Sequence, residues 1–162
     1  MMVLGVDPGK HGGIALLDFS GVLPVVVAAW NMPTTEDGEY DWFEAHDIMQ
    51  SVGEAVLCVE LTKNVRSGPH GRSSPSAVAS LSECRGGFEA LAASLGWTVV
   101  RVSPRTWQAD MLSGGDATTK AKVERALIDL RVELPRGCDN EGTRDAAMIA
   151  LWLGVESGAM SL

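Results

Sequence analysis

Closely spaced cysteines, long apolar runs and an excess of positive charge are all missing from this sequence. Three cysteines, Cys58, Cys84 and Cys138, are widely spaced with no C-x-x-C pair, which argues against a disulfide framework and a zinc site. The longest apolar stretch, residues 22–30, contains Pro24 and is too short to span a bilayer. The N-terminus has no basic region followed by an apolar one. We therefore expect a cytoplasmic protein without membrane association.

Charge is the feature least typical of a nucleic-acid-binding protein, because the net charge is -8. The distribution is uneven, however. Seven acids fall within residues 36–54, which contain no Lys or Arg, whereas eleven of the 13 basic residues lie in residues 63–136 beside seven acids. One basic and one acidic face would explain these counts, and so would charges scattered over a solvated surface. The length of 162 residues and the 46% apolar content predict one globular domain spanning residues 1–162.

The pattern of apolar segments and turn residues predicts an α/β fold with a five-stranded mixed sheet flanked by helices. Strands are expected at residues 2–7, 14–19 and 22–30, forming an antiparallel meander in which Ser20 and Gly21 join the last two, and at residues 55–59 and 97–102. Helices are expected at residues 42–52, 75–95, 104–112, 118–130 and 142–155, with a polar loop at 61–74.

Carboxylates stand at the ends of three of these segments. Asp7 closes the first strand, Glu60 closes the fourth, and Asp145 opens the last helix. If the first and fourth strands lie side by side and parallel, Asp7 and Glu60 emerge at the same edge of the sheet. Carboxylate oxygens with no His or Cys suit Mg²⁺ better than zinc. Each residue also has a simpler explanation: a turn opener, a strand end entering solvent, or an acid in the first turn of a helix.

Four sequence motifs together resemble the RuvC-type Holliday-junction resolvases of phages and bacteria, with matching order and spacing over nearly the whole chain. The motifs are G-V-D-P-G-K-H-G-G-I-A-L, the V-E that ends the fourth strand, V-S-P-R-T-W, and E-G-T-R-D-A-A-M-I-A-L-W. The resemblance implies the ribonuclease H-like fold, a homodimer acting on branched DNA, and no organic cofactor. It also implies two Mg²⁺ ions per active site, with Mn²⁺ as a substitute, held by Asp7, Glu60 and Asp145.

The fourth carboxylate is the position at which this sequence departs from the family pattern. Many relatives carry a second Asp three residues before the last one, but Gly142 occupies that place here. Glu141 is four residues before Asp145, so its longer side chain would lie on the same helical face. We assign Glu141 as the fourth ligand, with Asp139 as the alternative.

Basic residues near these motifs are the candidates for DNA contacts. Turn solubility, a surface loop and solvated helix charges explain them as well. Trp107, in the P-x-x-W segment, is interpreted as a structural core residue. The candidate DNA-binding residues are Lys10, Lys63, Arg66, Arg72, Lys120 and Lys122.

The function that best accounts for these features is a structure-selective endodeoxyribonuclease that resolves four-way DNA junctions by two-metal phosphodiester hydrolysis. Two alternatives remain open. A junction-binding protein that does not cut is favoured if Gly142 has removed the second metal. An actin-like phosphate-binding ATPase also opens with an Asp-containing Gly-rich turn, but that fold needs a second lobe.

Overall fold

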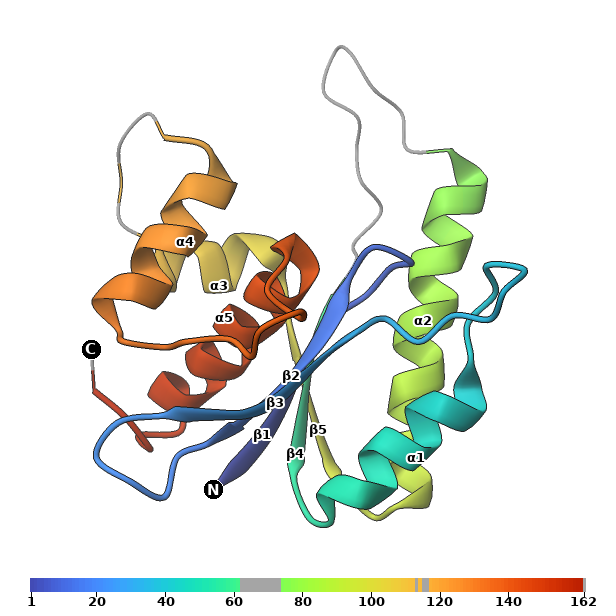
Figure 1. Ribbon diagram of the computed structural model, residues 1–162, viewed down its shortest axis with the longest axis horizontal. Helices are drawn as coiled ribbons and strands as arrows, with labels where there is room; N and C mark the ends of the chain where they lie inside the picture. Colours follow the sequence, from blue (N-terminus) through green and yellow to red (C-terminus); the bar gives the residue numbers. More distant parts are fainter. Residues whose placement is uncertain (62–73, 113, 115–116, 162) are drawn as a thin grey trace.

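A computed structural model describes residues 1–61, 74–112, 114 and 117–161, which form a five-stranded mixed sheet with helices on both faces (Figure 1). The strand order is β3-β2-β1-β4-β5. β1 and β4 are parallel, as are β4 and β5, whereas β1, β2 and β3 form the predicted antiparallel meander. The strands are β1 (Met2–Asp7), β2 (Gly13–Asp18), β3 (Val25–Asn31), β4 (Val56–Glu60) and β5 (Thr98–Val102). The predicted fold class is therefore confirmed.

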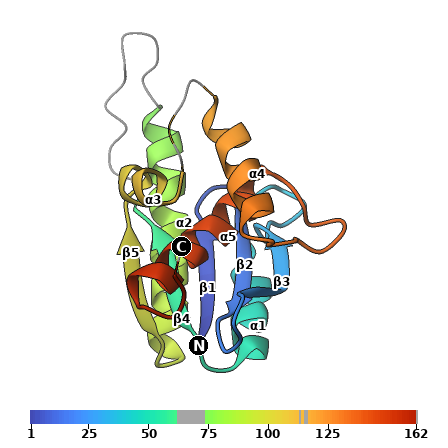
Figure 2. The same cartoon turned by 90° about the vertical axis from the view of Figure 1, so that its left-hand side faces the viewer.

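Within the described residues, five helices cover the two faces of the sheet and enclose separate hydrophobic cores (Figures 1 and 2). On one face lie α1 (Trp42–Val52) and α2 (Pro75–Ser94). The other face carries α3 (Pro104–Met111), α4 (Thr119–Asp129) and α5 (Glu141–Glu156). Because apolar side chains of the central strands enter both cores, β4 can be apolar without alternation, as its sequence required.

Local sequence signals set the helix boundaries. The α1 helix starts where the Asp41 carboxylate accepts hydrogen bonds from two backbone N–H groups of the first turn, and it ends at Gly53, whose φ of 79° favours glycine. Both α2 and α3 begin with proline after a capping serine. All five predicted helices therefore agree with the structure within two residues at each end.

The prediction for β3 was wrong at its start. The strand begins at Val25 rather than Val22, so its connection to β2 is longer than Ser20 and Gly21. Val22 is 99% exposed, and Pro24 has no N–H to donate to the neighbouring strand. A β-branched run therefore extended the predicted strand into residues that do not pair.

Two glycines bring the start of α5 into backbone contact with the β1–β2 hairpin. A Cβ on Gly5 of β1 would lie 2.1 Å from the carbonyl oxygen of Ala146. One on Gly142 would lie 2.4 Å from the carbonyl carbon of Gly12 and 2.5 Å from the His11 carbonyl oxygen. No side chain fits at either position. Asp at position 142 would require the hairpin and the helix to move apart.

Two further expectations concern membranes and thiols. Among the helices of the described residues, none combines the length and the apolar character needed to cross a membrane. The three cysteines are free thiols; Cys58 and Cys84 are buried, and Cys138 is half-buried. Cys58 and Cys84 thus fill the core.

Candidate active site

Four carboxylates from distant parts of the chain converge at one edge of the sheet. Val6 of β1 pairs with Val59 of β4 in parallel register, so Asp7 and Glu60, the next residues, leave the sheet side by side. The backbone contacts of Gly5 and Gly142 place the first turns of α5 over the same strand end. Asp7, Glu141 and Asp145 consequently line a common cavity of about 640 Å³.

The pKa values of these groups report their crowding. Burial, followed by repulsion from Glu60, Asp145 and Glu141, raises the pKa of Asp7 to about 8. Burial also raises the pKa of Glu60 to about 6, and Asp145 adds to the shift. The pKa of Asp145 is likewise about 6, because of burial and the charge of Glu141. The four groups therefore form one electrostatic cluster, in which a cation would relieve both desolvation and mutual repulsion.

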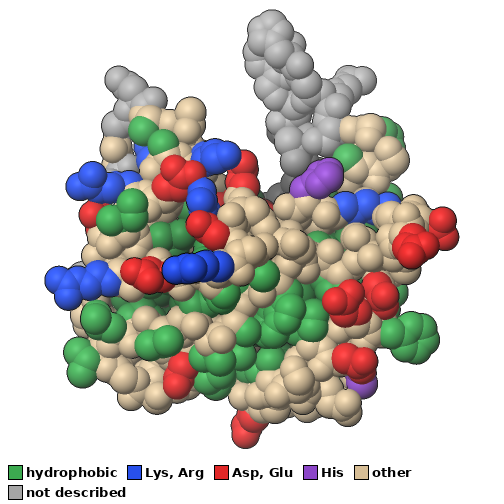
Figure 3. Space-filling model, viewed as in Figure 1, with side chains coloured by type: hydrophobic (Ala, Val, Ile, Leu, Met, Phe, Trp, Pro, Cys, Tyr) green, Lys and Arg blue, Asp and Glu red, His purple; other side chains and the backbone are tan. Residues whose placement is uncertain are grey.

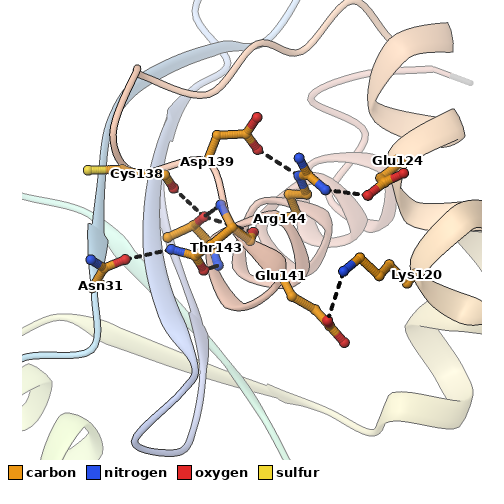
Figure 4. Close-up of polar contacts among 9 residues, drawn as sticks. Asn31, Lys120, Glu124, Cys138, Asp139, Glu141, Thr143 and Arg144 are labelled. Atoms are coloured by element: carbon orange, nitrogen blue, oxygen red, sulfur yellow. Dashed lines mark hydrogen bonds and ion pairs between the residues drawn. The ribbon is translucent and has the colours of Figure 1, made fainter.

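Two members of the cluster have partners from neighbouring helices. The indole Nε1 of Trp107 donates a hydrogen bond to Glu60 Oε2 at 2.7 Å. Lys120 Nζ of α4 lies 3.5 Å from Glu141 Oε2, and Figure 4 shows the two side chains directed at each other. In the part of the chain that the structure describes, no three His, Cys, Asp or Glu side chains gather closely enough to hold a metal ion. The all-oxygen donor set fits Mg²⁺ or Mn²⁺, but the side chains are not arranged as a complete coordination shell.

Asp139 lies outside this cluster. Its carboxylate accepts a hydrogen bond from Arg144 Nε at 2.6 Å, which holds the pKa of Asp139 below its usual value. Arg144 also donates to Glu124 of α4, so the guanidinium lies between the two acids (Figure 4). Glu141, by contrast, lines the cavity with Asp7 and Asp145 and contributes to the raised pKa of Asp7, so Glu141 and not Asp139 belongs to the cluster.

Two of the candidate DNA-binding residues, Lys10 and Lys120, border this region. Lys10, in the β1–β2 turn, lines the cavity; its Nζ lies 3.6 Å from Glu39 Oε1 and 5.9 Å from the Tyr40 ring centroid. Lys120 and Lys122 lie in the first turn of α4. In Figure 3, Lys and Arg side chains gather mainly over the α4 side of the view, interspersed with acidic ones. Lys63, Arg66 and Arg72 lie outside the described residues.

A second cavity of about 400 Å³ adjoins the first across the β1–β2 turn. The two cavities share Lys10, His11, Gly12, Glu141 and Gly142. The amide side chains of Asn31 and Asn140, which are hydrogen-bonded to each other at 2.5 Å, border the second cavity. Both cavities thus border the turn that follows Asp7.

Trp107 is the site residue that sequence reasoning missed. It was interpreted as core, and its ring is indeed fully buried. Its N–H nevertheless contacts a member of the carboxylate cluster. The available signal was its position in the first turns of a helix that follows β5, the strand next to the one ending at Glu60.

Comparison with known proteins provides structural neighbours only: no family model and no curated protein sequence matches the chain. RuvC from T. thermophilus in complex with a Holliday-junction substrate has a TM-score of 0.74 and 16% identity, covering 97% of this chain and 94% of that one. A second structure of Thermus thermophilus RuvC has a TM-score of 0.68 and 18% identity, with 98% of each chain covered. The yeast mitochondrial Holliday-junction resolvase Ydc2 has a TM-score of 0.60 and 12% identity, covering 97% of this chain and 79% of that chain. The chain therefore has the ribonuclease H-like fold that these Holliday-junction resolvases share.

Proposed function

We propose that the protein is a structure-selective endodeoxyribonuclease that resolves four-way or otherwise branched DNA by metal-dependent phosphodiester hydrolysis. The observation that carries this proposal is the convergence of Asp7, Glu60, Glu141 and Asp145 at the carboxyl ends of β1 and β4, where their charges repel one another. Acidic groups that repel at the edge of a depression are suited to divalent cations. The structural neighbours include a RuvC bound to such a junction, which supports the choice of substrate.

Each carboxylate has a distinct place in this proposal. Asp7, the most strongly perturbed member, would bridge two Mg²⁺ ions, which Mn²⁺ can replace. Glu60 and Asp145 would each hold one side, and Glu141 would complete the second position. Bound ions would supply activation of water and neutralisation of the charge that develops on the phosphate oxygens.

Basic groups next to the cluster would position the DNA backbone. Lys10 borders both cavities, so it lies where a strand crossing the β1–β2 turn would present its phosphates. Lys120 pairs with Glu141 and could exchange that carboxylate for a phosphate when cations occupy the cluster. Two symmetric nicks in a junction need two such sites, so we propose a homodimer as the active form.

The test is cleavage of a labelled four-way junction with Mg²⁺, beside a linear duplex of the same sequence. We expect the wild type to nick opposing strands of the junction and to leave the duplex intact. Asp7→Asn should bind the junction yet cut it at least ~100-fold more slowly, a barrier increase of about 2.7 kcal/mol. Asp37→Asn is the control, because Asp37 is an exposed acid of the loop before α1. Equal cutting by Asp7→Asn and wild type contradicts the assignment.

A junction-binding protein without nuclease activity is the second candidate. Two observations favour it. Glu60 and Glu141 are engaged by Trp107 and Lys120, and no three acids gather closely enough to hold a metal ion in the described part of the chain. The same assay separates the two functions. Tight junction binding without cleavage in Mg²⁺ or Mn²⁺ would establish the second.

A further inference from the structure

The hydrogen bond between Trp107 and Glu60 joins the protein core to the carboxylate cluster. Trp107 is completely buried and belongs to the core beneath α3 and α5. Its position is fixed by α3, which begins directly after β5, where the Leu61 backbone N–H donates to the Val102 carbonyl at 2.6 Å. The end of β4 and the start of α3 are therefore tied together, and the indole meets Glu60 from the protein interior.

Of the two hydrogen-bonded side chains, the Trp107 indole is the more rigid and the Glu60 carboxylate the more mobile. An indole offers one N–H donor and no acceptor, so a buried indole N–H needs a fixed acceptor. The ring is packed on all sides, whereas Glu60 ends a strand and is half-buried. At 2.7 Å the contact is short, as expected for a donor bonded to a charged carboxylate. The orientation of the Glu60 carboxylate is thus set by Trp107.

One oxygen of Glu60 consequently already carries a hydrogen bond from the protein, which makes it the weaker donor to a cation. Oε2 accepts from the indole, which leaves Oε1 as the oxygen not engaged by Trp107. Ligation through a single oxygen suits Mg²⁺, which is octahedral, retains waters and binds at about 2.1 Å. Ca²⁺ takes 6–8 oxygen ligands at about 2.3–2.6 Å and frequently binds a carboxylate through both oxygens.

Resting on the proposed metal-dependent function, we propose that Trp107 is a positioning residue that presents Glu60 to the cation through Oε1 alone and thereby favours Mg²⁺ over Ca²⁺. Without the indole N–H, Glu60 can turn and offer both oxygens. Trp107 then contributes to ion selectivity although it does not contact the ion.

The chain contains a matched control for this proposal. Trp152 of α5 donates its Nε1–H to Asp110 Oδ2 at 2.9 Å and is 9% exposed. It is therefore a second nearly buried tryptophan bonded to a carboxylate, and it packs in the same core. Asp110 does not contribute to the raised pKa of any of the clustered acids. Phenylalanine at either position removes the donor and keeps most of the ring.

The experiment measures Mn²⁺ binding by electron paramagnetic resonance, with Mg²⁺ and Ca²⁺ as competitors, in the full-length protein without DNA. We expect Trp107→Phe to weaken Mg²⁺ binding about 10-fold, as for other residues that orient metal ligands, and to weaken Ca²⁺ binding less. Trp152→Phe should leave both affinities at the wild-type value. In a Glu60→Ala background, Trp107→Phe should have no further effect on either affinity. An unchanged ratio of Mg²⁺ to Ca²⁺ affinities in Trp107→Phe overturns the proposal.

A measurement on the wild type avoids dependence on the folding of a variant. With ¹⁵N-labelled indoles, Mg²⁺ titration should shift the Trp107 Nε1–H resonance and leave that of Trp152 unmoved. A Trp107 resonance that stays fixed while ions bind also overturns the proposal. Failure of the proposed function is distinguishable, because then Asp7→Asn would bind Mn²⁺ as the wild type does. If Asp7→Asn abolishes binding and Trp107→Phe preserves the wild-type selectivity, only the role of Trp107 is wrong.

Discussion

Replacing Asp7 with Asn should stabilise the metal-free protein while abolishing the proposed cleavage. The pKa of Asp7 is about 8 in the folded state, against an ordinary value of 3.8 for an aspartate in an unfolded chain. Between these values the folded protein holds more protons than the unfolded chain, so the free energy of unfolding falls as pH rises. The stability is fully present below pH 3.8 and is lost as the pH approaches and passes about 8.

The magnitude follows from the same two pKa values. If the site were rigid, ionisation of Asp7 would lower the free energy of unfolding at pH 7 by about 4 kcal/mol. Rotation of the carboxylate and entry of water reduce this penalty. We therefore expect Asp7→Asn to raise the free energy of unfolding by about 2 kcal/mol at pH 7. For a chain of this length that corresponds to a rise of roughly 4–8 °C in Tm.

The assay is thermal unfolding by circular dichroism in EDTA, from pH 4 to pH 9. The wild type should lose stability with rising pH, and the curve of Asp7→Asn should be flatter and lie above it near neutrality. Added Mg²⁺ should stabilise the wild type, since ions bind only the folded state, and should have little effect on the variant. Asp37→Asn should follow the wild type throughout. If Asp7→Asn is no more stable than the wild type at pH 8 and its pH dependence is the same, Asp7 is not the crowded group described above.

Three further predictions concern other residues of the site. Gly142→Ala should destabilise the protein by about 1–3 kcal/mol in urea unfolding, because the added Cβ would meet the hairpin backbone. The control is Gly86→Ala of α2, where a Cβ has nothing within 4 Å and the change should be neutral or stabilising. Equal effects of the two substitutions would refute the close contact. Glu141→Gln should weaken Mn²⁺ binding measured by calorimetry, whereas Asp139→Asn, which removes only a partner of Arg144, should not; the reverse result would make Asp139 the fourth ligand. Lys120→Gln should change stability by less than ~1 kcal/mol, because its ion pair is exposed. The same change should reduce the slope of log Kd for junction DNA against log salt by about 0.9, and an unchanged slope would exclude a phosphate contact.

The sequence predicted most of the fold because its signals are local. Capping residues and prolines marked the helix starts, and apolar runs between turn residues marked the strands. The prediction of where β3 starts failed for a physical reason. β-branched residues favour a strand wherever they occur, but Pro24 has no N–H with which to pair with the neighbouring strand.

The carboxylate cluster was predictable in outline, because parallel strands end at one edge of a sheet and Glu141 is one helical turn from Asp145. What remained hidden were the contacts that depend on how separate segments or turns of the chain are placed in space. The bond from Trp107 to Glu60 spans 47 positions, and the pairing of Arg144 with Asp139 depends on how the chain turns before α5. Nothing in their local sequence distinguishes an indole that only fills the core from one that also binds a carboxylate.

The backbone-to-backbone contact between Gly142 and the hairpin has a consequence for how the sequence of this protein can change in evolution. Van der Waals radii of backbone atoms, which no rotamer change can alter, fix how near the loop after Asp7 lies to the turn that carries Asp145. The remainder of the interior can exchange one aliphatic residue for another without shifting that spacing. This backbone contact lets the polypeptide keep its clustered acids in place while other positions change.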